Sequence, residues 1–158
     1  MYPQSGPFAI VPAKTTQVFP MALPPQKVRE AVFQILFMSD FAPIEEEMVA
    51  FMMAEMKTTR REIVGALARV KEILEHLPDI DAAISRAATD YAFDRISRVE
   101  RTILRLGLFE LLFDRSIPQA IAIAEGIRLA RKFGTVESAQ FINAILDAHA
   151  AAKEPAPV

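Results

Sequence analysis

Apolar side chains recur every three to four residues along most of the chain, a spacing that predicts helices, and no segment shows the alternation of a strand. Proline, glycine and capping residues divide this pattern into seven helices joined by short loops. The expected helices cover residues 24–40, 44–56, 59–77, 80–90, 97–113, 118–133 and 135–149. The sequence therefore predicts an all-α protein.

The helix expected over residues 97–113 is the central element of this pattern. Ser97 and Glu100 fit a capping box, in which a hydroxyl and a carboxylate accept hydrogen bonds from N–H groups of the first turn. After Arg105, apolar residues occupy nearly every direction around the helix, which predicts burial among other helices. The arginines that share one face of this helix are Arg98, Arg101 and Arg105.

Glu110 lies among the apolar residues of this central helix. A buried, ionised carboxylate is costly unless it is paired, so we expect a structural ion pair with an arginine, or a backbone N–H partner, rather than a catalytic acid. The sequence leaves open whether an arginine of the same helix is that partner.

The second helix combines an acidic start with a methionine-rich face. Glu45, Glu46 and Glu47 fall in its first turn, where the helix dipole favours negative charge. The methionine-rich face is expected to pack in the core rather than to bind a partner. Its members are Met48, Phe51, Met52 and Met56.

The two ends of the chain differ from its middle. Residues 1–23 are rich in proline and are expected to form a disordered tail, with Met21 as a candidate start of the natural protein. Residues 24–149 are expected to form one folded domain, and residues 150–158 a frayed tail.

Composition excludes several kinds of protein. Cysteine is absent from the 158 residues, which excludes disulfides and thiolate sites and agrees with a cytoplasmic setting. Apolar runs are too short to cross a membrane. There is no glycine-rich phosphate loop, nucleophile elbow or pair of metal ligands at helical spacing, so we expect no enzyme activity, no cofactor and no metal site.

The formal net charge of −2 gives no general reason to bind nucleic acid, so any such binding depends on local clusters of basic residues. If two clusters converge beside Phe133 and Phe141, they would suit single-stranded RNA, with phosphates on the cations and bases on the rings. The alternative is that each cluster is only a charged helix face in contact with solvent. The clusters are Lys57, Arg60, Arg61, Arg69 and Lys71; Arg95, Arg98, Arg101 and Arg105; and Arg128, Arg131 and Lys132.

Four blocks of the sequence follow one another in a specific order. They are REAVFQILF at residues 29–37, DRISRVERTILRLGLFELL at residues 94–112, LARKFG at residues 129–134, preceded by Ile117-Pro118 and Glu125, and SAQFINAILD at residues 138–147. Together these blocks resemble the NusB family of bacterial transcription antitermination factors, over about residues 26–149.

The resemblance implies two helical bundles packed crosswise, residues 24–77 and 78–149, and a non-enzymatic role. NusB-like proteins pair with NusE, which is also a protein of the small ribosomal subunit. Together they hold the boxA element of nascent ribosomal RNA in a complex on RNA polymerase. Carried over by position, the RNA-contact candidates are Lys27, Arg29, Lys132, Phe133, Gln140 and Phe141.

The sequence also departs from the family. Members typically begin with an arginine-rich segment, whereas residues 24–29 hold only two positive charges, and each lost phosphate contact weakens RNA binding. Gly126 stands where the family usually has Ala, and should weaken the middle of its helix by up to about 1 kcal/mol. The family also usually has Asn at position 124 and Gly at position 144, where this chain has Ala.

Two other functions stay open. One is a helical protein–protein interaction module that kept the fold but binds RNA weakly or not at all. The other is the NusB-like RNA-binding domain that precedes some ribosomal RNA cytosine methyltransferases, for which the chain, ending at Val158, leaves no room for a methyl-donor domain. The sequence does not decide between a monomer and a homodimer.

Overall fold

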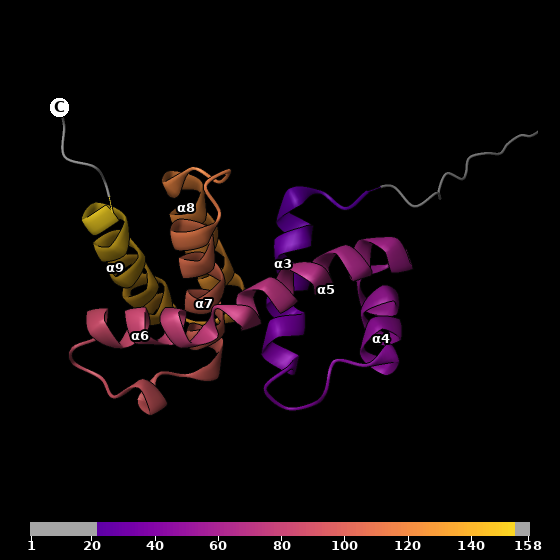
Figure 1. Ribbon diagram of the computed structural model, residues 1–158, viewed down its shortest axis with the longest axis horizontal. Helices are drawn as coiled ribbons and strands as arrows, with labels where there is room; N and C mark the ends of the chain where they lie inside the picture. The colour runs from indigo at the N-terminus through magenta and orange to yellow at the C-terminus, as the bar shows by residue number, and fades with distance from the viewer. Residues whose placement is uncertain (1–21, 154–158) are drawn as a thin grey trace, which may run out of the picture.

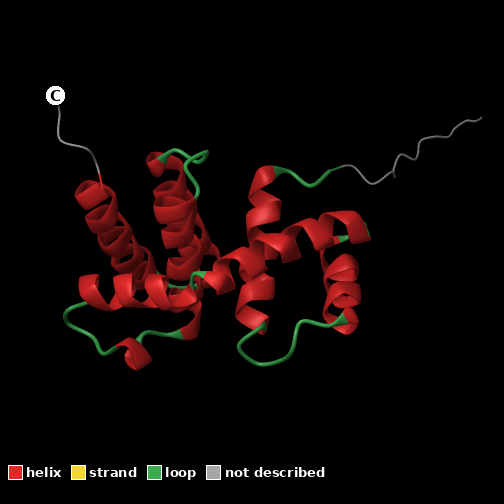
Figure 2. Cartoon of the chain, in the orientation of Figure 1, coloured by secondary structure: helices red, strands yellow, loops and turns green. Residues whose placement is uncertain are grey.

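Seven α-helices and one short 3-10 helix form the regular structure of residues 22–153, the part of the chain that the computed structural model describes (Figures 1 and 2). This confirms the predicted all-α fold. The tail expected at the N-terminus, up to residue 21, and the candidate start at Met21 lie outside the described residues. The elements are α3 (Pro25–Met38), α4 (Glu46–Met56), α5 (Arg60–Glu75), α6 (Leu77–Ala87), η2 (Phe93–Arg95), α7 (Arg98–Phe113), α8 (Gln119–Phe133) and α9 (Val136–Lys153).

The helices form two small bundles, as expected. Helices α3, α4 and α5 pack on one another, and α7, α8 and α9 pack together with α6 lying across them. Figure 1 shows α5 and α6 following each other across the molecule, with α3 on the side of the first bundle that faces α7 and α8. Contacts of α3 and α5 with α7 join the two bundles into one core.

Helix α7 is the buried central helix that the pattern predicts. Every residue from Thr102 to Leu111 is buried. At its start the Ser97 hydroxyl accepts a hydrogen bond from the Glu100 N–H (3.1 Å), and the Glu100 carboxylate accepts one from the Ser97 N–H (3.4 Å), which confirms the capping box. The cap satisfies N–H groups that the first turn leaves without helical partners.

Replacing Ser97 with Ala is expected to lower the free energy of unfolding by about 1 kcal/mol, the usual value for a lost N-cap. Chemical denaturation followed by circular dichroism measures this change. Ser85→Ala, at an exposed position within α6, is the matched control and should cost nothing, because Ala is the better helix former. Equal effects at the two positions would contradict a capping role for Ser97.

Several helix ends differ from the expected positions. Helix α5 ends at Glu75 rather than residue 77, and α6 spans Leu77–Ala87 rather than residues 80–90. Pro78 does not interrupt the chain here, because a proline in the first turn of a helix has no helical N–H bond to lose. At the other end α9 continues to Lys153, so the first residues of the expected frayed tail are helical.

Thr59 and Glu62 have the spacing of a capping box, but only half of the box forms at the start of α5. The Thr59 hydroxyl accepts a hydrogen bond from the Glu62 N–H (3.3 Å). The Glu62 carboxylate instead accepts a hydrogen bond from the Leu23 N–H (3.2 Å). Glu62 therefore ties the segment before α3 to the start of α5.

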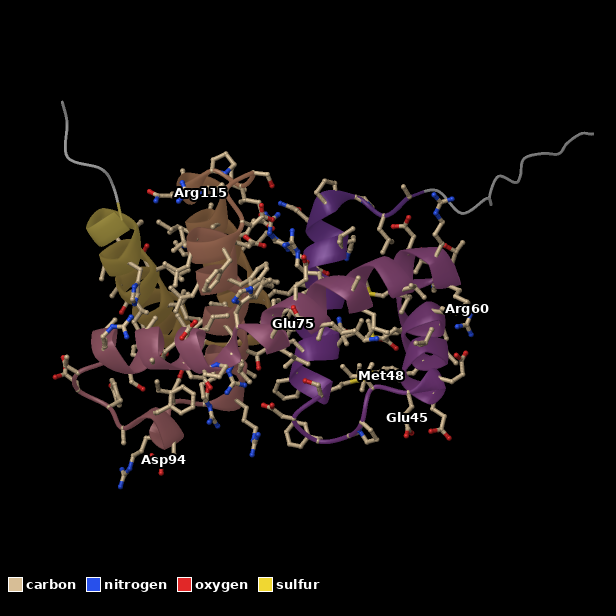
Figure 3. The ribbon with its side chains drawn as sticks, in the orientation of Figure 1. Glu45, Met48, Arg60, Glu75, Asp94 and Arg115 are labelled. Atoms are coloured by element: carbon tan, nitrogen blue, oxygen red, sulfur yellow. The ribbon has the colours of Figure 1, made fainter. Side chains whose placement is uncertain are left out.

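The methionine-rich face of α4 is largely core, with one exception. Met48 and Met52 are buried, but Phe51 is 52% exposed, so the expectation that it packs in the core is wrong. In Figure 3, Met48 lies between α3 and α4, whereas Glu45 lies at the lower end of α4. Phe51 is three residues after Met48 and lies at the edge of the face that Met48 and Met52 bury.

No helix in the described part of the chain combines the length and the apolar character needed to cross a bilayer.

Candidate nucleic-acid interface

Helices α3 and α8 meet at the buried carboxylate of Glu30. Lys27, one turn before Glu30 on α3, donates to its Oε1 (3.2 Å). From α8, Lys132 Nζ donates to the same oxygen (2.9 Å) and Arg128 Nη1 donates to Oε2 (2.7 Å). Arg128 and Lys132 are four residues apart and therefore share a helix face. The structure thus gathers three cations from two helices around one carboxylate.

The hydrogen bonds of this cluster favour the charged forms of Glu30, Arg128 and Lys132. Burial raises the pKa of Glu30, but the hydrogen bonds from Lys132, Arg128 and Lys27 outweigh it and hold that pKa at about 2. The hydrogen bond to Glu30 raises the pKa of Lys132, and hydrogen bonds to Glu125 and Glu30 raise the pKa of Arg128. The cluster therefore presents positive charge to solvent above a negative charge that is buried.

Aromatic rings lie beside the cations. Phe133, the residue after Lys132, stacks on Phe33 of α3 with ring centroids 4.7 Å apart. Phe133 also lines a hollow of about 320 Å³ together with Phe37 and Phe51. The pairing of cations with rings is the chemistry that single-stranded RNA needs, since phosphates bind cations and bases stack on rings.

Arg29 points away from this cluster, into the contact between the bundles. Its Nε donates to Glu110 Oε2 (2.9 Å), its Nη1 lies 3.7 Å from Glu125 Oε1, and its side chain is only 16% exposed. The structural ion pair expected for Glu110 is confirmed, with Arg29 as the partner. Burial raises the pKa of Glu110, and the hydrogen bond and charge of Arg29 oppose that rise.

The arginines of α7 have other partners. Arg105, which is buried, donates from Nε and Nη2 to the two oxygens of Asp81, both at 2.9 Å. Arg98 donates to Asp40 (3.3 Å) and lies over the exposed ring of Phe41. These contacts leave Arg29 of α3, rather than an arginine of α7, to pair with Glu110.

The remaining two RNA-contact candidates lie on α9. Gln140 is exposed. Phe141 packs edge-on against Tyr91, with centroids 5.4 Å apart, and lines a separate hollow of about 140 Å³ with Arg95. The structure therefore brings Lys27, Lys132 and Phe133 together and places Phe141 in a second group.

Three further residues of these groups were not among the candidates carried over by position. Arg128 already belongs to a basic cluster named from the sequence, and its spacing from Lys132 places both on one face of α8. Tyr91 and Arg95 lie in the connection between α6 and α7 and in η2, where no helical register relates them to Phe141. Only the folded chain brings this connection against α9.

The cationic cluster is nearly neutral as a whole. Its three cations lie against two carboxylates, so the sum of their charges is +1. The cations are Lys27, Arg128 and Lys132, and the carboxylates are Glu30 and Glu125. Within residues 22–153, no group of three His, Cys, Asp or Glu side chains is placed to hold a metal ion.

A second surface is apolar and lies on the first bundle. Phe41 is 62% exposed, and together with Met38, Pro43 and Phe51 it lines a hollow of about 350 Å³. This hollow adjoins the one beside Phe133, because both are lined by Met38 and Phe51. Two carboxylates, Glu45 and Glu47, also line it. Its exposed apolar lining makes this surface a candidate protein-binding site.

Comparison with known proteins identifies relatives of this chain. A model of the NusB family matches residues 26–151. The transcription antitermination protein NusB of Chlamydia pneumoniae is 39% identical over 125 residues, which are 78% of each chain. The protein of the same name from Thermotoga sp. strain RQ2 is 37% identical over 138 residues, 87% of this chain and 96% of the relative.

Solved structures give the same result for the fold. The structure of T. maritima NusB superposes with a TM-score of 0.70 at 36% identity and covers 87% of this chain and 96% of its own. A chain from the crystal structure of a plectonemic RNA supercoil superposes with a TM-score of 0.71 at 25% identity, covering 80% of this chain and 94% of its own. By its sequence and its structure, the chain belongs to the NusB family, whose relatives named here are transcription antitermination proteins.

Proposed function

We propose that this protein is a transcription antitermination factor that binds boxA-type single-stranded RNA of nascent ribosomal RNA together with NusE on RNA polymerase. The observation that carries the proposal is the convergence of Lys27, Arg128 and Lys132 beside the ring of Phe133. Such an arrangement binds nucleic acid without chemistry on it, so the proposed role is non-enzymatic.

Each candidate residue has a distinct proposed role. Lys27 and Lys132 would contact phosphates, and Phe133 and Phe141 would stack on bases, with Tyr91 supporting Phe141. Gln140 has an exposed amide that can read a base edge. Arg29 has a supporting role in this proposal, because its contacts are with two carboxylates at the bundle interface.

The apolar surface around Phe41 and Phe51 is the proposed docking site for NusE. A protein that also binds ribosomal RNA carries basic side chains, which the carboxylates of Glu45 and Glu47 would attract. The same surface could instead join two copies of this chain. Light scattering decides between these occupants, since a homodimer doubles the mass in the absence of NusE.

A second candidate function is a protein–protein interaction module with weak or no RNA binding. The charge balance of the cationic cluster favours it, because a net charge of +1 gives little general attraction for RNA. In that case only the apolar surface would carry function.

Replacing Lys27 and Lys132 together with Ala is expected to weaken binding of boxA RNA about tenfold in the presence of NusE, and to make it less dependent on salt, because phosphate contacts are lost. Titrations at two salt concentrations, with boxA and scrambled RNA, measure both effects. Lys71→Ala, at an exposed position on α5, is the matched control and should leave binding unchanged.

The same titrations test the proposed function itself. The unmodified protein with NusE should prefer boxA RNA to the scrambled sequence. Equal affinity for the two RNAs would reject the antitermination proposal. Unchanged RNA and partner binding by the double lysine variant would favour the interaction module.

A further inference from the structure

We propose that Glu30 is a positioning residue for RNA binding, whose buried carboxylate holds Lys27 and Lys132 together as a seat for a single backbone phosphate. This inference rests on the proposed function, and it adds to it a negatively charged residue that acts through the two lysines.

The Glu30 carboxylate is buried, whereas the ammonium groups of Lys27 and Lys132 lie at the surface. The side chain of Glu30 is 5% exposed, whereas those of Lys27 and Lys132 are 49% and 44% exposed. Both Nζ atoms donate to the same oxygen, Glu30 Oε1, at 3.2 and 2.9 Å, which limits their separation to about 6 Å. Two ammonium groups that close together can contact the oxygens of one phosphate.

Arg128 fixes the carboxylate itself. It donates to Glu30 Oε2 (2.7 Å), and its remaining donors reach Glu125 (2.9 Å) and the backbone oxygen of Gln26 (3.2 Å). Most of its N–H groups are therefore engaged within the protein. Each lysine has three N–H donors and gives one to Glu30, so two on each stay available to a ligand.

The two lysines need Glu30 in order to converge. Like charges at this separation repel each other, and long, half-exposed side chains have other rotamers in which to avoid the repulsion. The Glu30 carboxylate attracts both ammonium groups and so favours the rotamers in which they lie close together. Because the pKa of Glu30 is about 2, the carboxylate stays charged throughout the pH range in which RNA binding is measured.

Glu30→Gln separates positioning from simple charge. The substitution keeps the size of the side chain but adds one unit of positive charge to the site, which alone would strengthen binding to any RNA. If Glu30 positions the two lysines, the substitution should instead weaken RNA binding. We expect RNA affinity to fall about fivefold and the slope of log K against log salt to become shallower by about 0.7, the contribution of one phosphate on a single strand.

The control is Glu55→Gln, which makes the same change of charge at an exposed position on α4. It should leave the RNA affinity and the slope unchanged. Affinity for NusE should be unchanged in both variants, which excludes a general effect on the fold. Unchanged or tighter RNA binding by folded Glu30→Gln would overturn the proposal.

A second measurement does not require a change at Glu30. If Lys27 and Lys132 share one phosphate, the two single Ala variants and the double Ala variant all lose that one contact. The slope of log K against log salt should then become shallower by about 0.7 in each of the three variants. Two independent contacts would give about 1.4 for the double variant, which would also overturn the proposal.

Failure of the proposed function gives a different result. Phosphate contacts carry no sequence information, so scrambled RNA reports on the seat alone. Weaker binding of both RNAs by Glu30→Gln supports the seat even if the unmodified protein shows no preference for boxA. That lack of preference would count against the proposed function only.

Discussion

Replacing Arg29 with Ala is expected to lower the free energy of unfolding by about 3–5 kcal/mol, the range seen when a buried ion pair loses one partner. Arg29 Nε lies 2.9 Å from Oε2 of Glu110, and Glu110 is buried within α7. Without the guanidinium, that carboxylate would be left charged in an apolar setting. Urea denaturation measures the loss, and Arg131→Ala, at an exposed position on α8, is the control.

A double replacement tests whether the loss of stability comes from the Glu110 carboxylate that has lost its partner. Arg29→Met combined with Glu110→Leu replaces the ion pair with apolar side chains of similar size, and such replacements are often neutral or stabilising. The double variant should therefore recover most of the stability that Arg29→Ala loses. A double variant as unstable as the single one would show that packing around Arg29, rather than charge, accounts for the effect.

The pH dependence gives a second readout of the same pair. Burial raises the pKa of Glu110 above its ordinary value, and Arg29 opposes that rise. Without Arg29 this pKa rises further. Lowering the pH then protonates Glu110 in the folded state and removes the cost of burying its charge. The loss from Arg29→Ala should therefore be larger at pH 7 than at pH 5.

Titration of Glu30 does not affect the comparison between pH 7 and pH 5. Its pKa in the folded protein, about 2, lies below its ordinary value, so its contribution to stability is present above the ordinary value and is lost only as the pH falls from about 4.5 to 2. An equal loss from Arg29→Ala at pH 7 and pH 5 would contradict the raised pKa of Glu110.

The same variants decide whether Arg29 contacts RNA. If its role is structural, the folded double variant with Met at position 29 and Leu at position 110 should bind boxA RNA as the unmodified protein does. A loss as large as that expected for Lys27 and Lys132 would make Arg29 an RNA contact as well.

Local features of the fold could be predicted from the sequence because neighbouring residues determine them. The cap of α7 depends on Ser97 and Glu100, three residues apart, and both hydrogen bonds are present. Burial of α7 follows from apolar residues on all of its sides. The spacing of residues within one helix is sufficient for such predictions.

The binding surfaces depend on contacts that no spacing encodes. Glu30 is about one hundred positions from Arg128 and Lys132 in the sequence, so their convergence follows only from the packing of α3 near α8. The sequence gives the convergence of basic clusters beside Phe133 and Phe141 only as a condition, and in the folded chain each of these rings lines a hollow of its own.

Gly126 shows how packing reverses an expectation based on helix propensity. By propensity, Ala at this position would stabilise α8 by up to about 1 kcal/mol. A Cβ atom at Gly126 would lie 2.7 Å from Cδ1 of Leu146, and one at Gly107 would lie 3.1 Å from it. The two glycines therefore allow α7 and α8 to approach α9 closely, with Leu146 packed between them.

Replacing Leu146 with Ala is expected to lower the free energy of unfolding by about 3–5 kcal/mol, the upper part of the range for a fully buried leucine. The loss should be large because glycine at positions 107 and 126 has no side chain that could move into the cavity. Thermal or urea denaturation measures it. Val136→Ala, at an exposed position on α9, should change stability by less than about 0.5 kcal/mol.

A double-mutant cycle tests whether Leu146 and Gly126 are coupled. Gly126→Ala alone should destabilise the protein, because overpacking costs about 1–3 kcal/mol and outweighs the gain in helix propensity. In the Leu146→Ala background the added methyl group enters the cavity, so the same substitution should stabilise. A reversal of sign between the two backgrounds is the expected result, since residues that share a cavity are not additive. Equal effects in both would show that Gly126 is not needed for the close packing of α8 against α9.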